Sequence, residues 1–394
     1  MNPILARRYD TNQAVAVNLG DGTVESVEPQ LVRASVDPRE SSLPILAPGL
    51  FDLQVNGHGG REFSSPELTV ADVLKIANAM ASQGVARFLP TVTTAATEVL
   101  EHAMSTIAAA AQQTNTTGAR IEGIHLEGPF LSPEDGPRGA HPKEHCCPPS
   151  WELFERLQQA AQGQIRLVTM AAEYPEADEF IRRATNFGVK VAIGHTSAKG
   201  EQIAAAVTAG ATLSTHLGNG AHVTLPRHPN YIWSQLAEDR LWASLIADGF
   251  HLPPEVLKPI IRAKTANRCF LISDMSGYAG MPPGRYQTSL CELELLSSGK
   301  IVVAGQETLL AAASMPLTVG IANIAQHTDV TRANAIDLAS VQPARFLNEN
   351  SDANNFLEPC SPADFTLLQW PADESAEIEV LATIVGGKLV FGSL

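Results

Sequence analysis

The most constraining feature of this sequence is a strand-then-helix pattern that recurs between residues 44 and 276. Short runs of apolar and β-branched residues each end in a polar or Gly-containing stretch, and Ala-rich segments with helical spacing follow them. The pattern predicts a (β/α)8 barrel, a TIM-like fold that needs about 250 residues. A doubly wound open sheet is the alternative, but no Gly-rich dinucleotide fingerprint follows these runs. The eight runs cover residues 44–55, 86–94, 120–128, 165–173, 190–198, 211–219, 241–249 and 270–277.

The two ends of the chain differ from this middle part. Residues 14–29, 363–370 and 378–391 are strand-like and are punctuated by Asp-Gly and Gly-Gly turns. We therefore expect both ends to pair in one small β-sandwich domain, built from residues 1–46 and 359–394, with the barrel over 47–358. Within the barrel segment, residues 286–305 are expected to form a hairpin, and residues 314–328 and 331–347 late helices.

Composition excludes several classes of function. A formal charge of −15 argues against nucleic-acid and anionic membrane partners, because these require a basic surface. The sequence contains no apolar stretch long enough to span a bilayer and no signal-peptide core. The five cysteines, Cys146, Cys147, Cys269, Cys291 and Cys360, form no metal-ligand pattern. An odd number of cysteines predicts reduced thiols and a cytoplasmic location.

Four polar residues stand at the ends of predicted strands, where a barrel of this type carries its active site. Glu127 ends the third run, His195 the fifth, His216 the sixth and Asp274 the eighth. Two imidazoles and a carboxylate at an open-topped cavity are typical of a catalytic zinc site. Each residue alone also fits a structural role, since a histidine at a strand end is more often a hydrogen-bonded core residue. Asp274 is either a turn-capping carboxylate or, the interpretation we favour, the general base.

The end of the first strand indicates how many metal ions are bound. Gln54 and Asn56 share one face there, at positions where two histidines could have held a second metal ion. Neutral amides are poor zinc ligands, and the end of the fourth strand offers no lysine. We therefore predict one divalent metal ion, Zn²⁺ before Fe²⁺, Mn²⁺, Co²⁺ or Ni²⁺. His125 is expected to orient a metal ligand by a hydrogen bond.

An ordered set of motifs spans almost the whole chain: APGLFDLQVNG, FLPTVTT, HLEGPFLSPEDGPRGAH, IGHTSA, STHLGN, ADGFH, ISDMSGYAGMPPGRY and IVGGKLVF. The set resembles the amidohydrolase superfamily, and most specifically the N-acetylglucosamine-6-phosphate deacetylases. The resemblance implies a metal-bearing barrel with a small β-sandwich. It also implies that Glu127, His195 and His216 are metal ligands and that Asp274 is the catalytic acid and base.

The same resemblance implies where the substrate lies. His141 would contact the sugar, while Arg227 and His251 would bind the phosphate, reaching across a homodimer interface in related enzymes. A guanidinium and an imidazolium suit a phosphate group. Arg227 on its own also fits an ordinary surface arginine. Four further residues complete the expected substrate contacts: Gln54, Asn56, Asn219 and Gly220.

The expected function is hydrolysis of N-acetylglucosamine 6-phosphate to glucosamine 6-phosphate and acetate. Three segments depart from the family pattern, namely THLGNGAH, TLLAAASMPL and NNFLEPCSPADF. These segments lie around the sugar pocket, so an amidohydrolase acting on another N-acyl sugar or another amide is the alternative. A non-catalytic binding homologue is a further alternative, but such a protein has no physical reason to retain all four groups of the site.

Overall fold

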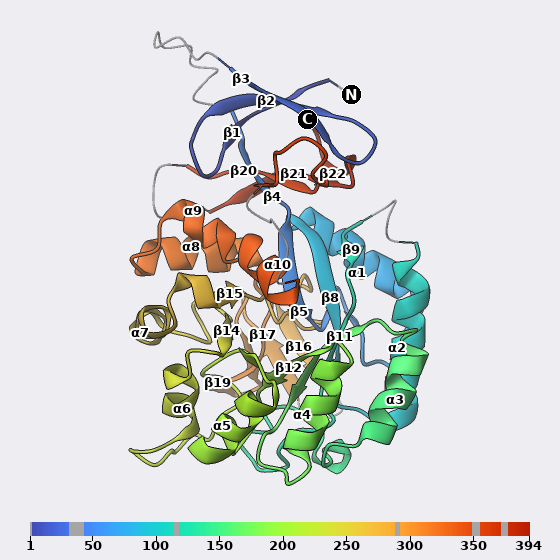
Figure 1. The fold of residues 1–394 in the computed structure, drawn as a ribbon, viewed down its shortest axis with the longest axis vertical. Coiled ribbons are helices and arrows are strands. Elements are labelled where there is room, and N and C mark those ends of the chain that lie inside the picture. The colour runs from blue at the N-terminus through green and yellow to red at the C-terminus, as the bar shows by residue number, and fades with distance from the viewer. Residues whose placement is uncertain (1, 31–42, 114–117, 288–291, 349–354, 372–376) are drawn as a thin grey trace.

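The protein was analysed as a computed structural model, and Figure 1 shows a barrel with a smaller sheet at one end. The barrel strands are all parallel and neighbour one another in the order β15-β14-β13-β12-β11-β10-β8-β5, with the short β9 (Arg120–Ile121) beside β8. The structure describes residues 2–30, 43–113, 118–287, 292–348, 355–371 and 377–394. The strands are β5 (Leu50–Val55), β8 (Val85–Thr93), β10 (Ile124–Glu127), β11 (Ile165–Met170), β12 (Lys190–Ile193), β13 (Leu213–Ser214), β14 (Trp242–Leu245) and β15 (Cys269–Leu271). The predicted (β/α)8 barrel is confirmed.

The helices cover the outside of the barrel. Polar side chains begin several of them: the Thr69 side chain accepts a hydrogen bond from a backbone N–H of α1, and Ser150 and Asn230 do the same for α3 and α6. The helices that follow the strands are α1 (Val70–Ser82), α2 (Thr97–Ala111), α3 (Trp151–Ala160), α4 (Ala177–Asn186), α5 (Gly200–Ala209), α6 (Tyr231–Ala237) and α7 (Pro254–Lys264). Three late helices are α8 (Leu317–His327), α9 (Arg332–Asp337) and α10 (Val341–Leu347).

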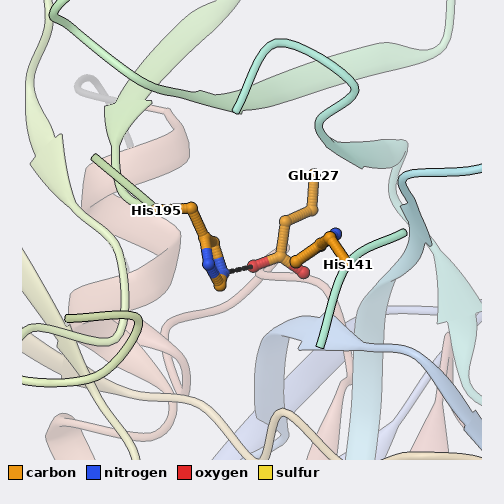
Figure 2. Close-up of side chains that lie close together, drawn as sticks. All are labelled: Glu127, His141 and His195. Atoms are coloured by element: carbon orange, nitrogen blue, oxygen red, sulfur yellow. Dashed lines mark hydrogen bonds and ion pairs between the residues drawn. The ribbon is translucent and has the colours of Figure 1, made fainter. Parts of the chain in front are cut away.

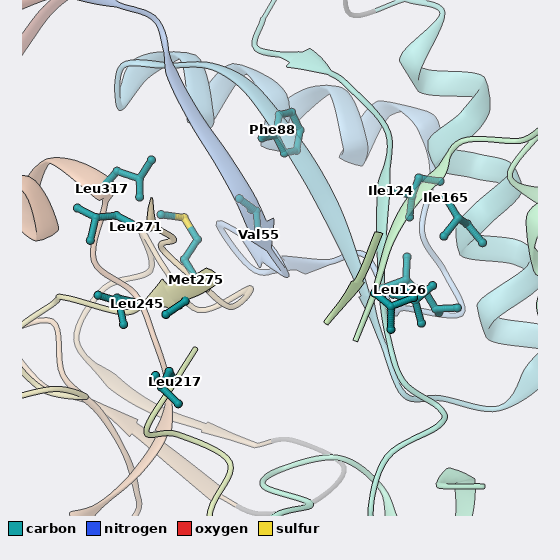
Figure 3. Packing of buried hydrophobic residues seen from close by; sticks show 14 of the residues in the cluster. Val55, Phe88, Ile124, Leu126, Ile165, Leu217, Leu245, Leu271, Met275 and Leu317 are labelled. Atoms are coloured by element: carbon teal, nitrogen blue, oxygen red, sulfur yellow. The ribbon is translucent and has the colours of Figure 1, made fainter. Parts of the chain in front are cut away.

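Two apolar layers hold the barrel together, because successive strand residues point to opposite faces. One layer lies between strands and helices and includes Phe88, Leu126 and Leu245, which Figure 3 labels. The other fills the barrel interior and includes Phe51 and Leu167. Burial on both faces explains why the strands read as nearly continuous apolar runs.

Helix α10 closes the barrel interior at the amino ends of the strands. Phe346 of this helix is 2% exposed, and its ring centroid lies 5.2 Å from that of Phe270 and 5.9 Å from that of Trp242, the first residue of β14. With this end filled by apolar side chains, polar groups are left to gather at the carboxyl ends.

The first and last strands meet at these carboxyl ends. Met275 forms a parallel bridge with Val55, and the backbone N–H of Asp274 donates to the carbonyl oxygen of Gln54 at 2.9 Å. The chain then forms a four-stranded antiparallel sheet, β16 (Gly284–Gln287), β17 (Glu292–Leu295), β18 (Ile301–Val303) and β19 (Gln306–Ala312). The expected hairpin is therefore part of a larger sheet, and its residues 288–291, which include Cys291, lie outside the described residues.

Strands from both ends of the chain form one seven-stranded mixed sheet in the order β22-β21-β20-β4-β1-β2-β3. Strands β2 and β3 lie above the carboxy-terminal strands in Figure 1, and Val15 and Val17 share an apolar cluster with Phe365 and Ile384. The expected small β-domain is confirmed, whereas its boundaries at residues 46 and 359 stay a prediction. The strands are β1 (Ile4–Arg8), β2 (Ala14–Leu19), β3 (Val24–Pro29), β4 (Ile45–Pro48), β20 (Phe365–Gln369), β21 (Glu379–Val385) and β22 (Lys388–Gly392).

Two further expectations concern the cysteines and the membrane. Each cysteine that the structure describes, Cys146, Cys147, Cys269 and Cys360, is a free thiol. Among the described residues, no helix combines the length and the apolar character needed to cross a bilayer.

We predict that Phe346→Ala destabilises the barrel by about 3–5 kcal/mol, because it opens a cavity among buried aromatic rings. Urea unfolding followed by circular dichroism measures the effect. Phe187→Ala is the matched control, since Phe187 is 60% exposed and should change stability by less than about 1 kcal/mol. Equal midpoints for the two variants would contradict the role of α10 as the plug of the barrel.

Candidate active site

Four polar side chains converge at the carboxyl ends of the barrel strands. Glu127 is the last residue of β10, and His195, His216 and Asp274 follow β12, β13 and β15 within three residues. The backbone at His195, His216 and Asp274 has φ values of 49°, 29° and 52°, a left-handed region that non-Gly residues rarely occupy. Strain of this kind costs about 1–3 kcal/mol per residue and is concentrated at functional sites. The fold therefore holds these three side chains in place against a local backbone preference.

The donor atoms of Glu127, His195 and His216 form a tight triangle. Nε2 of His195 lies 3.2 Å and Nε2 of His216 lies 3.1 Å from Oε1 of Glu127, and the two nitrogens are 3.0 Å apart. All three side chains are buried. Ligand atoms bound at about 2.0–2.1 Å to one tetrahedral ion stand about 3.3 Å apart. The triangle therefore has the dimensions of a single-ion site.

Hydrogen bonding around His195 supports the same conclusion. Nδ1 of His195 donates to the carbonyl oxygen of Pro137 at 2.8 Å, which leaves the lone pair of Nε2 in the neutral ring directed at the carboxylate of Glu127. Two electron-rich atoms facing each other in a buried site fit a cation between them. Burial acts to raise the pKa of Glu127, but the adjacent imidazoles of His195 and His216 outweigh this effect and hold the pKa well below its usual range.

His141 lies beside this triangle. Donor atoms of Glu127, His141 and His195 all lie within 4.8 Å of one another, and Figure 2 shows the two histidines next to the Glu127 carboxyl group. Nδ1 of His141 is 3.0 Å from Oγ1 of Thr94. Burial lowers the pKa of His141 to about 3, so the ring is neutral. A neutral ring held at Nδ1 presents Nε2 to a metal ion or to a substrate hydroxyl group.

Gln54 also contacts Glu127. It comes from β5, which lies on the other side of β10 from the strands β12 and β13 that precede the two histidines. Nε2 of Gln54 donates to Oε1 of Glu127 at 2.8 Å, while Oε1 of Gln54 accepts a hydrogen bond from the hydroxyl group of Thr215 at 3.1 Å. This pair of bonds fixes which end of the amide faces Glu127. A hydrogen-bond donor therefore lies where a second metal ion would require a ligand.

Asp274 is the buried carboxylate next to the triangle. Nδ2 of Asn56 donates to Oδ1 of Asp274 at 2.8 Å and also lies 3.2 Å from its backbone oxygen. Burial and the nearby charge of Glu127 raise the pKa of Asp274 to about 6, although His216, Asn56 and His251 act in the opposite direction. A carboxyl group with this pKa can both accept and release a proton near neutral pH.

The remaining predicted residues lie in the loops around these groups. Asn219 donates through Nδ2 to the backbone oxygen of His216 at 3.2 Å, and Gly220 packs against the His195 ring. His251 is half-buried, and its Nδ1 is 2.8 Å from Oδ2 of Asp248. Arg227 is exposed on the loop after β13. The structure thus brings His251 close enough to influence Asp274, whereas Arg227 points to solvent within the single chain.

Sequence similarity to known proteins agrees with this geometry. Residues 45–390 match the amidohydrolase family. The chain belongs to this family. It is 33% identical to N-acetylglucosamine-6-phosphate deacetylase of Homo sapiens over 91% of this chain and 86% of that one. It is also 33% identical to N-acetylgalactosamine-6-phosphate deacetylase of Escherichia coli O157:H7, over 84% of each.

Solved structures extend the similarity to the whole fold. The crystal structure of N-acetyl-D-glucosamine-6-phosphate deacetylase from Mycobacterium smegmatis superimposes with a TM-score of 0.83 at 26% identity, covering 98% of this chain and 100% of that one. A mutant of that enzyme has been solved in complex with N-acetyl-D-glucosamine 6-phosphate, and its TM-score is 0.82 at 25% identity, with 99% and 100% covered. The resemblance seen in the sequence is confirmed, and the chain is an amidohydrolase with a buried Glu/His cluster suited to a metal ion.

Several contacts in this amidohydrolase were not expected from its sequence. Gln54 and Asn56 were predicted to contact substrate, yet their amide groups are directed at Glu127 and Asp274. His125 was expected to orient a ligand, but its Nε2 lies 2.8 Å from Oγ1 of Thr169. The Pro137 carbonyl was missed because backbone acceptors leave no signal in residue type. Thr94, by contrast, ends the second predicted strand and could have been found by its position.

We predict that Glu127→Gln weakens zinc binding by more than about 100-fold, because it removes the only negative charge among the three proposed ligands. Competition with a chromophoric chelator, applied to the metal-stripped protein, measures the dissociation constant. Glu122→Gln is the matched control, since Glu122 lies beside β9 and pairs with Arg120 at the opposite end of the barrel. Unchanged zinc affinity in Glu127→Gln would exclude the site.

Proposed function

We propose that this amidohydrolase removes the acetyl group from an N-acetylated hexosamine 6-phosphate, with N-acetylglucosamine 6-phosphate as substrate. The observation that carries the proposal is the pairing of the Glu127–His195–His216 triangle with Asp274, in a chain similar over most of its length to deacetylases of such sugars. A non-catalytic homologue would not need a strained backbone at three of these residues.

One divalent metal ion, zinc in our proposal, would be held by Glu127, His195 and His216. When bound, this ion would act as a Lewis acid toward the acetamide carbonyl and the attacking water. The donor set of two imidazole nitrogens and one carboxylate oxygen suits zinc, and it is also acceptable to Fe²⁺, Mn²⁺, Co²⁺ or Ni²⁺. Gln54 would keep the Glu127 carboxylate in its orientation through the 2.8 Å hydrogen bond.

Asp274 would carry the proton in both halves of the reaction. Its carboxylate takes a proton from water as the water oxygen bonds to the acetyl carbon. The same proton then passes to the amine nitrogen as the carbon–nitrogen bond breaks, which yields acetate and the free amino sugar phosphate. Asn56 orients the carboxylate for this task, because its amide donates to Oδ1 at 2.8 Å. A raised pKa of about 6 supports such a dual role.

The substrate contacts follow from the loops. His141, through Nε2, would accept a hydrogen bond from a sugar hydroxyl group, and Asn219 and Gly220 would line the same side of the pocket. Arg227 and His251 would bind the phosphate. Arg227 is exposed here, which agrees with a role in the site of a neighbouring subunit.

We also propose a homodimer. Val223 is 98% exposed and Trp233 is 55% exposed, so the segment that carries Arg227 presents two large apolar side chains to solvent. Free thiols at all the described cysteines fit a cytoplasmic enzyme. N-acetylgalactosamine 6-phosphate is the second candidate substrate, since a relative named for that sugar is 33% identical to this chain.

Acetate release from three compounds tests the proposal. The zinc-loaded protein should hydrolyse N-acetylglucosamine 6-phosphate, with N-acetylgalactosamine 6-phosphate and unphosphorylated N-acetylglucosamine measured in parallel. A higher kcat/KM for the galacto epimer would replace the first substrate by the second. Absence of turnover on both phosphorylated sugars, with zinc bound, would contradict the proposal and direct the search to other amides.

We predict that Asn56→Leu moves the acidic limb of the kcat/KM profile upward by about one pH unit. The hydrogen bond from Asn56 lowers the pKa of Asp274, and a bond to a charged group contributes about 1.5 kcal/mol, or about one unit. The base is active when deprotonated, so activity falls as pH drops through its pKa, and a higher pKa places that fall at higher pH.

Two comparisons make this experiment decisive. Asp274→Asn should bind zinc with wild-type stoichiometry but show no measurable turnover, and appreciable activity would exclude the assigned base. Asn18→Leu is the control for the amide, because Asn18 donates to Ser26 in the small sheet and should leave the pH profile unchanged. An acidic limb at the same pH in Asn56→Leu and wild type would show that another group titrates.

A further inference from the structure

Two loops at the mouth of the barrel are joined by a contact between Glu134 and His222. Glu134 belongs to the loop after β10, and His222 to the loop after β13. Nε2 of His222 lies 3.2 Å from Oε2 of Glu134. The loops also touch through backbone, since a Cβ atom built on Gly136 would lie 2.8 Å from Cα of His222. We refer to the Glu134–His222 pair as the loop clasp.

Both residues of the clasp make further hydrogen bonds. The hydroxyl oxygen of Tyr231 accepts from the backbone N–H of His222 at 2.8 Å and lies 3.0 Å from Nδ1 of the same residue. With the Tyr231 hydroxyl donating to Nδ1, the hydrogen on Nε2 faces Glu134. Oε1 of Glu134 lies 3.0 Å from the hydroxyl oxygen of Ser197, whose one hydrogen is shared with Oε1 of Glu173 at 3.1 Å. The clasp is therefore anchored on one side by a buried tyrosine and on the other by the loop that carries His195.

Both loops joined by the clasp approach the ring of His195 closely. A Cβ atom on Gly139, from the first loop, would lie 3.2 Å from Cε1 of His195. A Cβ atom on Gly220, from the second loop, would lie 2.9 Å from Nδ1 of that ring. The two glycines have φ values of 60° and 56°, so the loops adopt conformations that side chains at these positions would oppose. Backbone of both loops thus lies close to the Nδ1–Cε1 edge of the imidazole.

The first loop also supplies the acceptor that fixes the ring. The carbonyl oxygen of Pro137 accepts from Nδ1 of His195 at 2.8 Å. Pro137 lies three residues after Glu134 in the chain, and Gly220 lies two residues before His222. A displacement of either loop at the clasp would therefore move a group that touches the imidazole. Backbone or carboxylate partners of this kind set the orientation and tautomer of metal-binding histidines.

We propose that Glu134 and His222 are positioning residues that act through His195. By joining the two loops, they keep the Pro137 carbonyl on Nδ1 and aim the lone pair of Nε2 at Glu127 and His216. The inference rests on the proposed metal-binding role of His195 but not on the identity of the substrate. Because the Glu134 and His222 side chains are 57% and 31% exposed, the clasp adds little to global stability. Its effect falls on the geometry of the metal site.

Cobalt binding to the metal-stripped full-length protein tests the proposal without any substrate. His222→Leu should raise the dissociation constant for cobalt about fivefold, which is the size of effect that an exposed ion pair can have on an equilibrium. The visible d–d bands of the cobalt protein should change as well, because the His195 ring is less constrained. His222→Gln keeps a donor at the Nε2 position and should restore both readouts. The melting temperature should remain close to that of the wild type.

Controls separate the clasp from general damage. His228→Leu changes another histidine of the same loop, whose ring lies against Trp233, and should bind cobalt as the wild type does. Glu134→Ala removes the partner at an exposed position, so it tests the clasp even if His222→Leu does not fold. The double variant Glu134→Ala with His222→Leu should bind cobalt no more weakly than either single variant, because each single variant already removes the same interaction.

Each result has a distinct meaning. Wild-type affinity and spectrum in both His222→Leu and Glu134→Ala would overturn the clasp and leave the proposed function intact. Additive losses in the double variant would also overturn it, because the two residues would then act independently. A wild-type protein that binds no cobalt would overturn the metal site of the proposed function and the clasp together.

Discussion

Oε1 of Glu127 is contacted by three nitrogen atoms at once. Nε2 of Gln54, His216 and His195 lie 2.8, 3.1 and 3.2 Å from it. These side chains come from three different strand ends, so the contacts exist only in a barrel with the observed strand order and register. A shift of β10 by one residue would turn Glu127 away from the interior, since successive side chains point to opposite faces. The contacts of the site therefore depend directly on the strand register of the barrel.

Bringing these side chains together also requires a strained backbone at three residues of the site. A left-handed backbone at His195, His216 and Asp274 is unfavourable for residues with a Cβ atom, and glycine would adopt it without cost. Glycine would, however, remove the imidazole or carboxylate that the site requires. The two apolar layers of the barrel and the α10 plug hold the strand ends rigidly enough to maintain these conformations. The packed barrel therefore maintains backbone conformations at the site that the local sequence alone would not favour.

The sequence predicts those features that follow from residue type and period. Continuous apolar runs indicated the eight strands, and polar residues at their ends indicated that Glu127, His195 and His216 would converge, as the structure places them. Finer contacts depend on side-chain direction and on backbone groups. Period-two spacing placed Gln54 and Asn56 on one face, but it could not show that one amide reaches Glu127 and the other Asp274. The contact with the Pro137 carbonyl could not be predicted from the sequence either, because every residue carries such a backbone acceptor.

The negative net charge of the protein bears on how the proposed substrate, a sugar phosphate, can bind. A sugar phosphate must approach a protein of net charge −15, so attraction has to come from a local group. His251 is a weak source, because its imidazole is paired with Asp248 at 2.8 Å and any positive charge there is largely compensated. Arg227 is always charged and stands exposed, with a planar guanidinium that matches phosphate geometry. Within the proposed pair, Arg227 would therefore supply the attraction and His251 a hydrogen bond, while the charge of His251 acts to lower the pKa of Asp274.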